Sequence, residues 1–157
     1  MELASYLVAV VAVLGVGMIY GTDACAALVL RPAYARVDDR TLVTVTGFGH
    51  YYGDRRFPVP GVLGVVATVL AGVAAALAGR GWATAAAAVA TVALVAWLVI
   101  YKVVAAPVNK RLTAAAFAGE VPADARALQE KWDSVVTLRF VLQGVAVAAL
   151  CGVLALP

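Results

Sequence analysis

Four long apolar stretches dominate this sequence and restrict its fold to a bundle of membrane-spanning helices. They cover residues 4–30, 58–79, 82–106 and 135–156, and a spanning helix needs roughly 20 mainly apolar residues. The chain of 157 residues is 64% hydrophobic and 13% charged, whereas soluble domains are roughly 45–50% apolar and about 25% charged. A soluble domain this small does not bury so much apolar surface. We therefore predict an all-α fold in which residues 1–157 form one integral membrane domain, a four-transmembrane-helix bundle.

The connections and the cationic residues predict how the four helices are oriented. Only the tripeptide Gly-Arg-Gly separates the second stretch from the third, so these helices are expected to form a tight antiparallel hairpin. Eleven of the twelve Lys and Arg residues lie at the opposite ends of the stretches, and Arg80 in the hairpin is the exception. By the positive-inside rule, both termini are expected outside the plasma membrane and the two long loops in the cytoplasm. The basic residues thus indicate a lipid bilayer as partner, and no nucleic acid.

The remaining segments either form short helices or end the long ones. The first stretch lacks a basic leader and a clear cleavage site, so we expect a retained helix and not a signal peptide. Residues 38–52 carry apolar side chains at spacings of three and four, which indicates a short interfacial helix between the first two spans. Those side chains are Leu42, Val45, Phe48 and Tyr52. Pro107 is expected to end the third helix, and the fourth is expected to begin in water near Ala123.

Asp23 and Arg139 are charged residues inside predicted spans, where an unpaired charge is unfavourable. Asp23 lies in the first span, eight residues before Arg31, and Arg139 lies in the fourth. A carboxylate at such a depth costs roughly a few kcal/mol or more unless it is paired, protonated or facing a wet cavity. We expect Asp23 to pair with Arg139 across the bundle. The pair either fixes helix packing or lines a substrate cavity, and these two interpretations are compatible.

A segment just before the second span carries the densest group of polar and aromatic side chains. It contains His50, the only histidine, followed by Tyr51, Asp54 and Arg55. Histidine is well suited to exchanging protons near neutral pH, although a hydrogen-bonded loop histidine produces the same pattern. The arginines are suited to binding a phenolate, a carboxylate or a lipid phosphate. They also serve as simple membrane anchors without any further function.

Few side chains are available to hold a metal ion or cofactor. Cys25 and Cys151 are expected at different depths, which argues against a disulfide. No zinc or copper ligand spacing and no nucleotide-binding glycine motif occurs. Asn109 is expected either to cap backbone groups or to hydrogen-bond a ligand. We predict no cofactor, with a single metal ion or haem on His50 left open.

Three separated motifs together resemble the anthrone oxygenase-like family, a group of small four-helix membrane proteins found mostly in bacteria. RPAYARVDD follows the first span, APVNKRL ends the third and LQEKWDSVVTLR enters the fourth. The matching positions are Pro32, Ala33, Pro107, Asn109, Leu112, Trp132 and Arg139. The resemblance implies a bacterial inner membrane and the oxidation by O2 of a lipophilic, electron-rich aromatic such as an anthrone, without an evident cofactor.

The resemblance also implies roles for particular side chains. His50 or Asp23 is the implied base, and Arg139 is the implied clamp for the anionic substrate. The substrate-binding residues that we expect are Tyr20, Tyr51, Asp54, Arg55, Asn109 and Trp132. Two other functions stay open: a non-enzymatic protein that binds a small molecule or lipid, and a structural or assembly subunit. The Ala- and Gly-rich second and third helices also permit a homo-oligomer.

Overall fold

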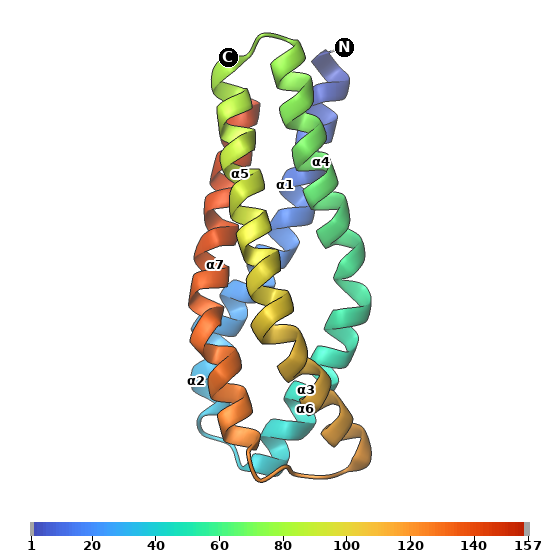
Figure 1. The fold of residues 1–157 in the computed structure, drawn as a ribbon, viewed down its shortest axis with the longest axis vertical. Coiled ribbons are helices and arrows are strands. Elements are labelled where there is room, and N and C mark those ends of the chain that lie inside the picture. The colour runs from blue at the N-terminus through green and yellow to red at the C-terminus, as the bar shows by residue number, and fades with distance from the viewer. Residues whose placement is uncertain (1, 156–157) are drawn as a thin grey trace.

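The chain forms an elongated bundle of four long helices with a smaller helical layer at one end (Figure 1). The computed structural model describes residues 2–155, and the side chains of residues 5–155. Its elements are α1 (Glu2–Cys25), η1 (Ala26–Leu30), α2 (Arg31–Tyr34), α3 (Asp39–Arg56), α4 (Pro58–Leu77), α5 (Gly81–Ile100), η2 (Tyr101–Ala105), α6 (Ala106–Ala118) and α7 (Ala125–Ala155). Four continuous helical stretches are long and apolar enough to cross a membrane. The predicted all-α bundle and its membrane class are therefore confirmed; residue 156, at the end of the fourth predicted span, lies outside the described residues.

The two ends of the bundle differ in their connections. At one end, which we call the hairpin end, residues 78–80 join α4 to α5 and Gly79 adopts a φ of +71°. This is the short hairpin predicted from the Gly-Arg-Gly tripeptide. At the opposite end, which we call the loop end, residues 35–38 lead into α3 and residues 119–124 lead into α7. α7 begins at Ala125, close to the predicted start near Ala123.

Pro107 does not end the third helix as predicted, because a π-helical segment precedes it. Proline lacks a backbone N–H, and in a regular α-helix its ring collides with the carbonyl group four residues earlier. In η2 the backbone is wider, and the N–H of Ala106 donates to the carbonyl of Tyr101, five residues earlier. Pro107 then lies in the first turn of α6, where no N–H is needed. The third apolar helix therefore continues to Ala118.

The first helix contains the same combination of a π-helical segment and a proline. In η1 the N–H of Arg31 donates to the carbonyl of Ala26, and Pro32 lies in the first turn of α2. The helix consequently extends to Tyr34 and not to residue 30, the end that the apolar run predicts. Each π-helical segment re-aims the side chains that follow it. Both segments flank the cavity described below.

The membrane part of the bundle packs through very small side chains near the hairpin end. Its buried alanines come from all four long helices and are Ala9, Ala12, Ala67, Ala71, Ala75, Ala83, Ala87, Ala90, Ala93 and Ala146. α1 and α4 approach most closely at Gly15 and Gly64. A Cβ atom on Gly15 would lie 2.7 Å from the carbonyl oxygen of Pro60 and 2.8 Å from the Cα of Gly64. These two glycines therefore allow backbone-to-backbone contact, as small residues do between transmembrane helices.

At the loop end, α3 packs against α6 in a layer outside the four-helix core. The predicted helix over residues 38–52 is confirmed and runs further, from Asp39 to Arg56. It contacts α6 at Gly47, where a Cβ atom would lie 2.4 Å from the Cβ of Ala116. Of the four apolar side chains of the predicted stripe only Leu42 is buried; the exposed ones are Val45, Phe48 and Tyr52. Contact with α6 therefore determines the buried face of α3, and an interfacial position of the exposed stripe stays a prediction.

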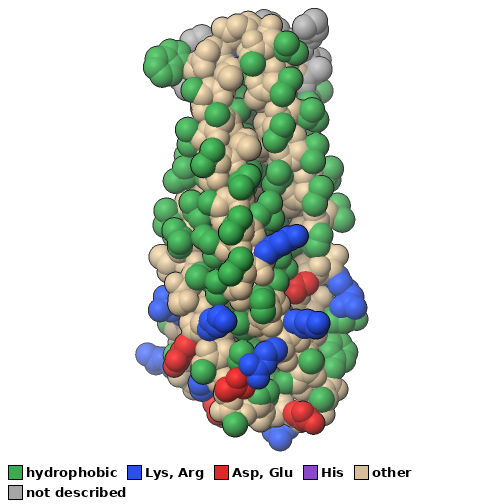
Figure 2. Space-filling model, in the orientation of Figure 1, with side chains coloured by type: hydrophobic (Ala, Val, Ile, Leu, Met, Phe, Trp, Pro, Cys, Tyr) green, Lys and Arg blue, Asp and Glu red, His purple; other side chains and the backbone are tan. Residues whose placement is uncertain are grey.

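Charged side chains gather at the loop end, and hydrophobic side chains cover most of the remaining length in Figure 2. Arg80 is the basic residue at the hairpin end, where its Nη2 donates to the carbonyl of Val153 at 2.9 Å. At the loop end, Arg126 holds the segment before α3 by donating to the carbonyls of Tyr34 and Val37 and pairing with Asp39 at 2.7 Å. The uneven distribution of Lys and Arg along the sequence thus places most of them at one end of the folded bundle.

The Gly15–Gly64 contact leads to a stability prediction. Gly15→Ala is expected to lower the free energy of unfolding by about 1–3 kcal/mol, because the added methyl group forces α1 and α4 apart. Gly17→Ala is the matched control, since a Cβ atom there meets no atom within 4 Å. It should leave stability unchanged or raise it slightly through helix propensity. Unfolding in mixed micelles checks both variants, and equal stabilities would contradict the close contact.

Candidate active site

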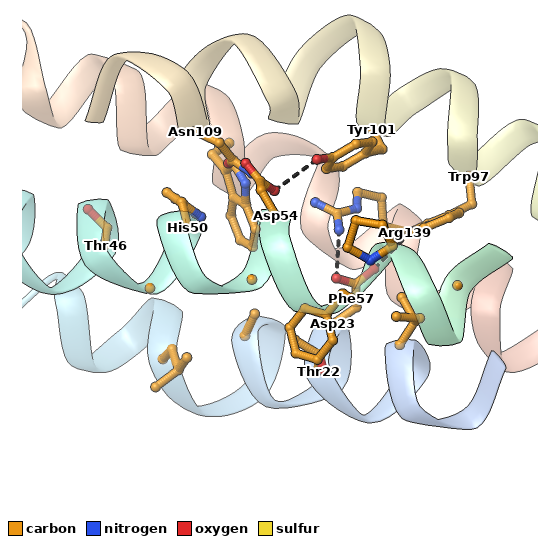
Figure 3. Close-up of a pocket in the computed structure, with 18 of the residues that line it drawn as sticks. Thr22, Asp23, Thr46, His50, Asp54, Phe57, Trp97, Tyr101, Asn109 and Arg139 are labelled. Atoms are coloured by element: carbon orange, nitrogen blue, oxygen red, sulfur yellow. Dashed lines mark hydrogen bonds and ion pairs between the residues drawn. The ribbon is translucent and has the colours of Figure 1, made fainter. Parts of the chain in front are cut away.

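A cavity of about 450 Å³ lies in the half of the bundle nearer the loop end. Its lining residues come from α1, η1 and α2, from α3 and the start of α4, from α5, η2 and α6, and from α7. Most of its wall is apolar, and a small set of polar side chains converges within it (Figure 3). Its volume falls in the range of roughly 300–1,000 Å³ that is usual for ligand sites.

The centre of the cavity wall is a buried ion pair between α1 and α7. Arg139 Nη2 lies 2.7 Å from Asp23 Oδ1, and the two residues are 5% and 2% exposed. The second carboxylate oxygen of Asp23 accepts a hydrogen bond from Trp97 Nε1 at 3.0 Å. Both oxygens therefore have a donor, which stabilises the ionised form in an apolar surrounding. The predicted Asp23–Arg139 pair is confirmed, and it lines the cavity.

Three aromatic rings surround the guanidinium group of Arg139. Its central carbon lies 5.2 Å from the ring centroid of Trp132, 5.7 Å from that of Tyr101 and 6.0 Å from that of Trp97. Such distances allow cation–π attraction, which is stronger when the cation is desolvated. The Nε and Nη1 atoms of Arg139 are buried and have no hydrogen-bond partner among the described residues. The guanidinium group is thus held in place while two of its nitrogen atoms remain available to donate hydrogen bonds.

A second carboxylate joins α3 to the third long helix. Asp54 accepts hydrogen bonds from the hydroxyl of Tyr101 at 2.8 Å and from Nδ2 of Asn109 at 3.0 Å. The side-chain amide of Asn109 therefore lies at the cavity, where it hydrogen-bonds the carboxylate of Asp54 and does not cap a helix. Asp54 itself is exposed and lines the cavity.

His50 lies one helical turn before Asp54 on the face of α3 that looks into the cavity (Figure 3). Its ring centroid lies 5.6 Å from that of Trp132. Burial lowers the pKa of His50 to about 4, with the charge of Arg139 acting in the same direction and Asp54 opposing it. The imidazole is therefore neutral at pH 7. Its Nε2 atom is buried and has no hydrogen-bond partner within residues 5–155.

Further buried polar atoms without a hydrogen-bond partner among the described residues lie on α7 towards the loop end. Gln129 donates to Asp133 Oδ1 at 3.0 Å, and both residues line the cavity. The Oε1 of Gln129 and the Nε1 of Trp132 are buried without a hydrogen-bond partner in the described part of the chain. Unpaired buried polar groups each cost about 1–3 kcal/mol. A bound molecule or water with complementary groups would satisfy them.

The structure brings six of the nine predicted site residues together and leaves three outside. The cavity wall includes Asp23, His50, Asp54, Asn109, Trp132 and Arg139. Tyr20 does not line it; its ring stacks on Phe140 at 5.4 Å and lies against Gly144. Tyr51 does not line it either, since its ring contacts Phe117 and lies under the guanidinium of Arg55 at 3.7 Å. Successive helical residues point in different directions, so Tyr51 and Arg55 face away from the side that His50 and Asp54 share.

Several residues of the cavity wall were not predicted from the sequence. Trp97 and Tyr101 lie one turn apart on the third helix, and they donate hydrogen bonds to Asp23 and Asp54 respectively. Thr22, Gln129 and Asp133 also line the cavity. A signal for the two aromatic residues exists in the sequence, because a Trp and a Tyr spaced by four inside an otherwise aliphatic span share one helix face. Gln129 and Asp133 have the same spacing.

Comparisons with known proteins and a search for metal ligands add no further assignment. No protein-family model, no curated protein and no solved structure matches this chain. Among the described residues, no three His, Cys, Asp or Glu side chains are grouped to hold a metal ion. Cys25 and Cys151 are free, exposed thiols. The arrangement of the side chains in the cavity is therefore the basis for a functional proposal.

The ion pair leads to a prediction about stability. Asp23→Leu is expected to lower the free energy of unfolding by about 3–5 kcal/mol, because Arg139 is then buried without a counter-charge. The double variant Asp23→Leu/Arg139→Met should recover most of that loss. Reversible unfolding of the three proteins in mixed micelles checks this. A double variant no more stable than the single one would show that the two charges are not coupled.

The environment of His50 leads to a prediction about pH. The unfolded chain binds a proton on His50 near pH 6.5 and the folded protein only near pH 4. Between these values the unfolded state binds more protons, so the free energy of unfolding should rise with pH from 4 to 6.5 and level off above. Because His50 is the only histidine, its ring signals in an NMR titration give the pKa directly. His50→Gln should lose this part of the pH dependence, and a measured pKa near 6.5 would contradict the buried position.

Proposed function

We propose that this protein is a membrane-embedded oxygenase that uses O2 to oxidise a lipophilic aromatic molecule with an acidic C–H group. The resemblance to the anthrone oxygenase-like family supports this reaction class. We further propose that it lies in a bacterial plasma membrane with its loop end in the cytoplasm, as the gathering of Lys and Arg at that end suggests.

One observation carries the proposal: a neutral imidazole and a partly uncommitted guanidinium face the same apolar cavity. His50 offers a lone pair near neutral pH, and Arg139 offers N–H donors to a developing anion. Asp23 is a poorer base, because Arg139 and Trp97 already donate to both of its oxygens. The base role, which the sequence left open between the two, is therefore assigned to His50.

The reaction that fits these groups begins with proton removal. His50 takes the proton of an activated CH₂ group, and the electron pair left behind spreads over the aromatic rings onto an oxygen that Arg139 holds. Fixed donors of this kind stabilise the developing charge without reorganising during the reaction. The carbanion passes one electron to O2, and the resulting substrate radical and superoxide combine to form a C–O bond. The peroxide anion takes back the proton held by His50 and becomes a hydroperoxide. Removal of the remaining C–H proton then breaks the O–O bond and releases water, so that CH₂ and O2 become C=O and H₂O.

The aromatic wall suits a flat substrate. Trp97, Tyr101 and Trp132 present their rings on the cavity side that also carries the charged groups. Offset stacking of a polycyclic substrate on such rings contributes about 0.5–1.5 kcal/mol beyond the burial of its area. The largely apolar wall strengthens the interaction of Arg139 with an anionic oxygen, because the local dielectric constant is lower than that of water.

Oxygen uptake with an electron-rich anthrone tests the proposal. The purified protein should consume O2 above the spontaneous rate, and His50→Ala should lower the enzymatic rate by a factor of about 10²–10⁴ through loss of the base. Thr44→Ala is the matched control, since Thr44 is exposed on the same helix and bonds only to the carbonyl of Arg40. Uptake equal to the spontaneous background would refute the oxygenase. Saturable anthrone binding without uptake would instead support the non-enzymatic binding protein.

A further inference from the structure

The cavity is long and its two ends differ in chemistry. Along the first helical stretch its wall runs from Ile19 to Tyr34, which is about 22 Å at a rise of 1.5 Å per residue. A single aromatic head group occupies only part of such a length. The rest of the cavity therefore has space for a second part of a bound molecule.

The end nearer the middle of the bundle is apolar. Its wall there consists of aliphatic side chains from three helices, including Ile19, Val62, Val66 and Leu98. Asp23 lies one helical turn from Ile19, but both of its carboxylate oxygens already accept hydrogen bonds from Arg139 and Trp97. The aliphatic end of the cavity is therefore suited to hydrocarbon and not to a polar group.

The end nearer the loops is polar. The buried atoms without a hydrogen-bond partner that line the cavity belong to His50, Asn109, Gln129, Trp132 and Arg139. A molecule that satisfies both ends must therefore carry its oxygen atoms on one end and hydrocarbon on the other.

The cavity also reaches the outer surface of the bundle between α1 and α4. Val62 and Val66 line it, yet they are 61% and 51% exposed on the surface that faces lipid. Thr22 on α1 is likewise exposed and lines it. Towards the hairpin end, the contact of Gly15 with Gly64 closes the space between the two helices. A molecule dissolved in the leaflet at the loop end therefore has a lateral path into the cavity.

We infer that the substrate is an amphiphile taken from the bilayer, with a phenolic head at the His50–Arg139 end and an alkyl or prenyl tail at the Ile19–Val66 end. This inference rests on the proposed function in that it places the reacting ring beside His50. It adds the tail, which the charged site alone does not require. The tail binds in the aliphatic end, where each buried CH₂ group that leaves water contributes about 0.8 kcal/mol, or roughly fourfold in affinity.

Binding of 4-alkylphenols under nitrogen tests the inference without requiring turnover. The probes are 4-methylphenol and 4-nonylphenol, and the readout is the fluorescence of Trp97 and Trp132 in a Trp82→Phe background. Trp82 is 72% exposed and does not line the cavity, so its removal leaves two reporters inside. In the test variant Val62→Phe/Val65→Phe, two rings fill the aliphatic end, because both valines line it. The control is Val69→Phe, which adds a ring to the exposed face of the same helix.

We expect 4-nonylphenol to bind the Trp82→Phe protein at least about tenfold more tightly than it binds the test variant, as loss of two or more CH₂ contacts predicts. The affinities of these two proteins for 4-methylphenol should agree within about twofold, and the Val69→Phe control should bind both probes as the Trp82→Phe protein does. Fixed micelle concentration makes partition of each probe equal for all proteins. Equal weakening of both probes, no weakening of either, or no saturable binding of 4-nonylphenol would each overturn the inference. Tail-dependent binding combined with a failure to consume O2 would retain it and refute only the oxygenase.

Discussion

The buried pair of Asp23 and Arg139 is the interaction on which the rest of the site depends. It joins the first and last helices, which are separated by 116 residues in the chain. Two charges in an apolar bundle must be paired and hydrogen-bonded to be tolerated. Trp97 donates a hydrogen bond to the second carboxylate oxygen of Asp23. The aromatic rings around Arg139 replace part of the hydration that its guanidinium group loses on burial. The pair therefore fixes where α1, α5 and α7 lie relative to one another beside the cavity.

The helices that line the cavity are not regular. η1 and η2 each precede a proline and lie at the same end of the bundle. Without the widened turn, Pro107 would break the third helix, and Asn109 could not follow Tyr101 along one continuous helix to reach Asp54. π-Helical turns are frequent at functional sites because they redirect side chains at little change in helix direction. In this protein they flank the cavity from two opposite sides.

Most of the fold could be predicted from the sequence, because the bilayer imposes it. Apolar length determines the four helices, and the tripeptide around Arg80 determines the hairpin. The pairing of Asp23 with Arg139 was predictable as well, since a buried charge needs a partner and few were available. The effect of Pro107 was not predictable, because proline ends a helix or follows a π-turn according to tertiary contacts.

The candidate site was predictable only in part, because its geometry depends on how α3 lies. The carboxylate of Asp54 meets Tyr101 and Asn109, which lie 47 and 55 residues further along the chain. That meeting depends on the contact of Gly47 with α6, and no local pattern reports such a contact. Tyr51 was assigned to the site because it adjoins His50 in sequence, but adjacent helical residues point in different directions. Trp97 was missed because an aromatic residue in an apolar span gives no polar signal.

The incomplete hydrogen bonding beside the ion pair favours the proposed ligand cavity over a purely structural role for the pair. Replacing a buried ion pair by apolar side chains of similar size is often neutral or stabilising, so packing alone gives little reason to keep one. A purely structural pair would at least be fully satisfied, since each unpaired buried polar group costs about 1–3 kcal/mol. Within residues 5–155, Arg139 keeps two nitrogen atoms unpartnered and His50 keeps one, all beside the same cavity. An anionic oxygen on the proposed substrate would supply acceptors for the unpartnered nitrogen atoms of Arg139.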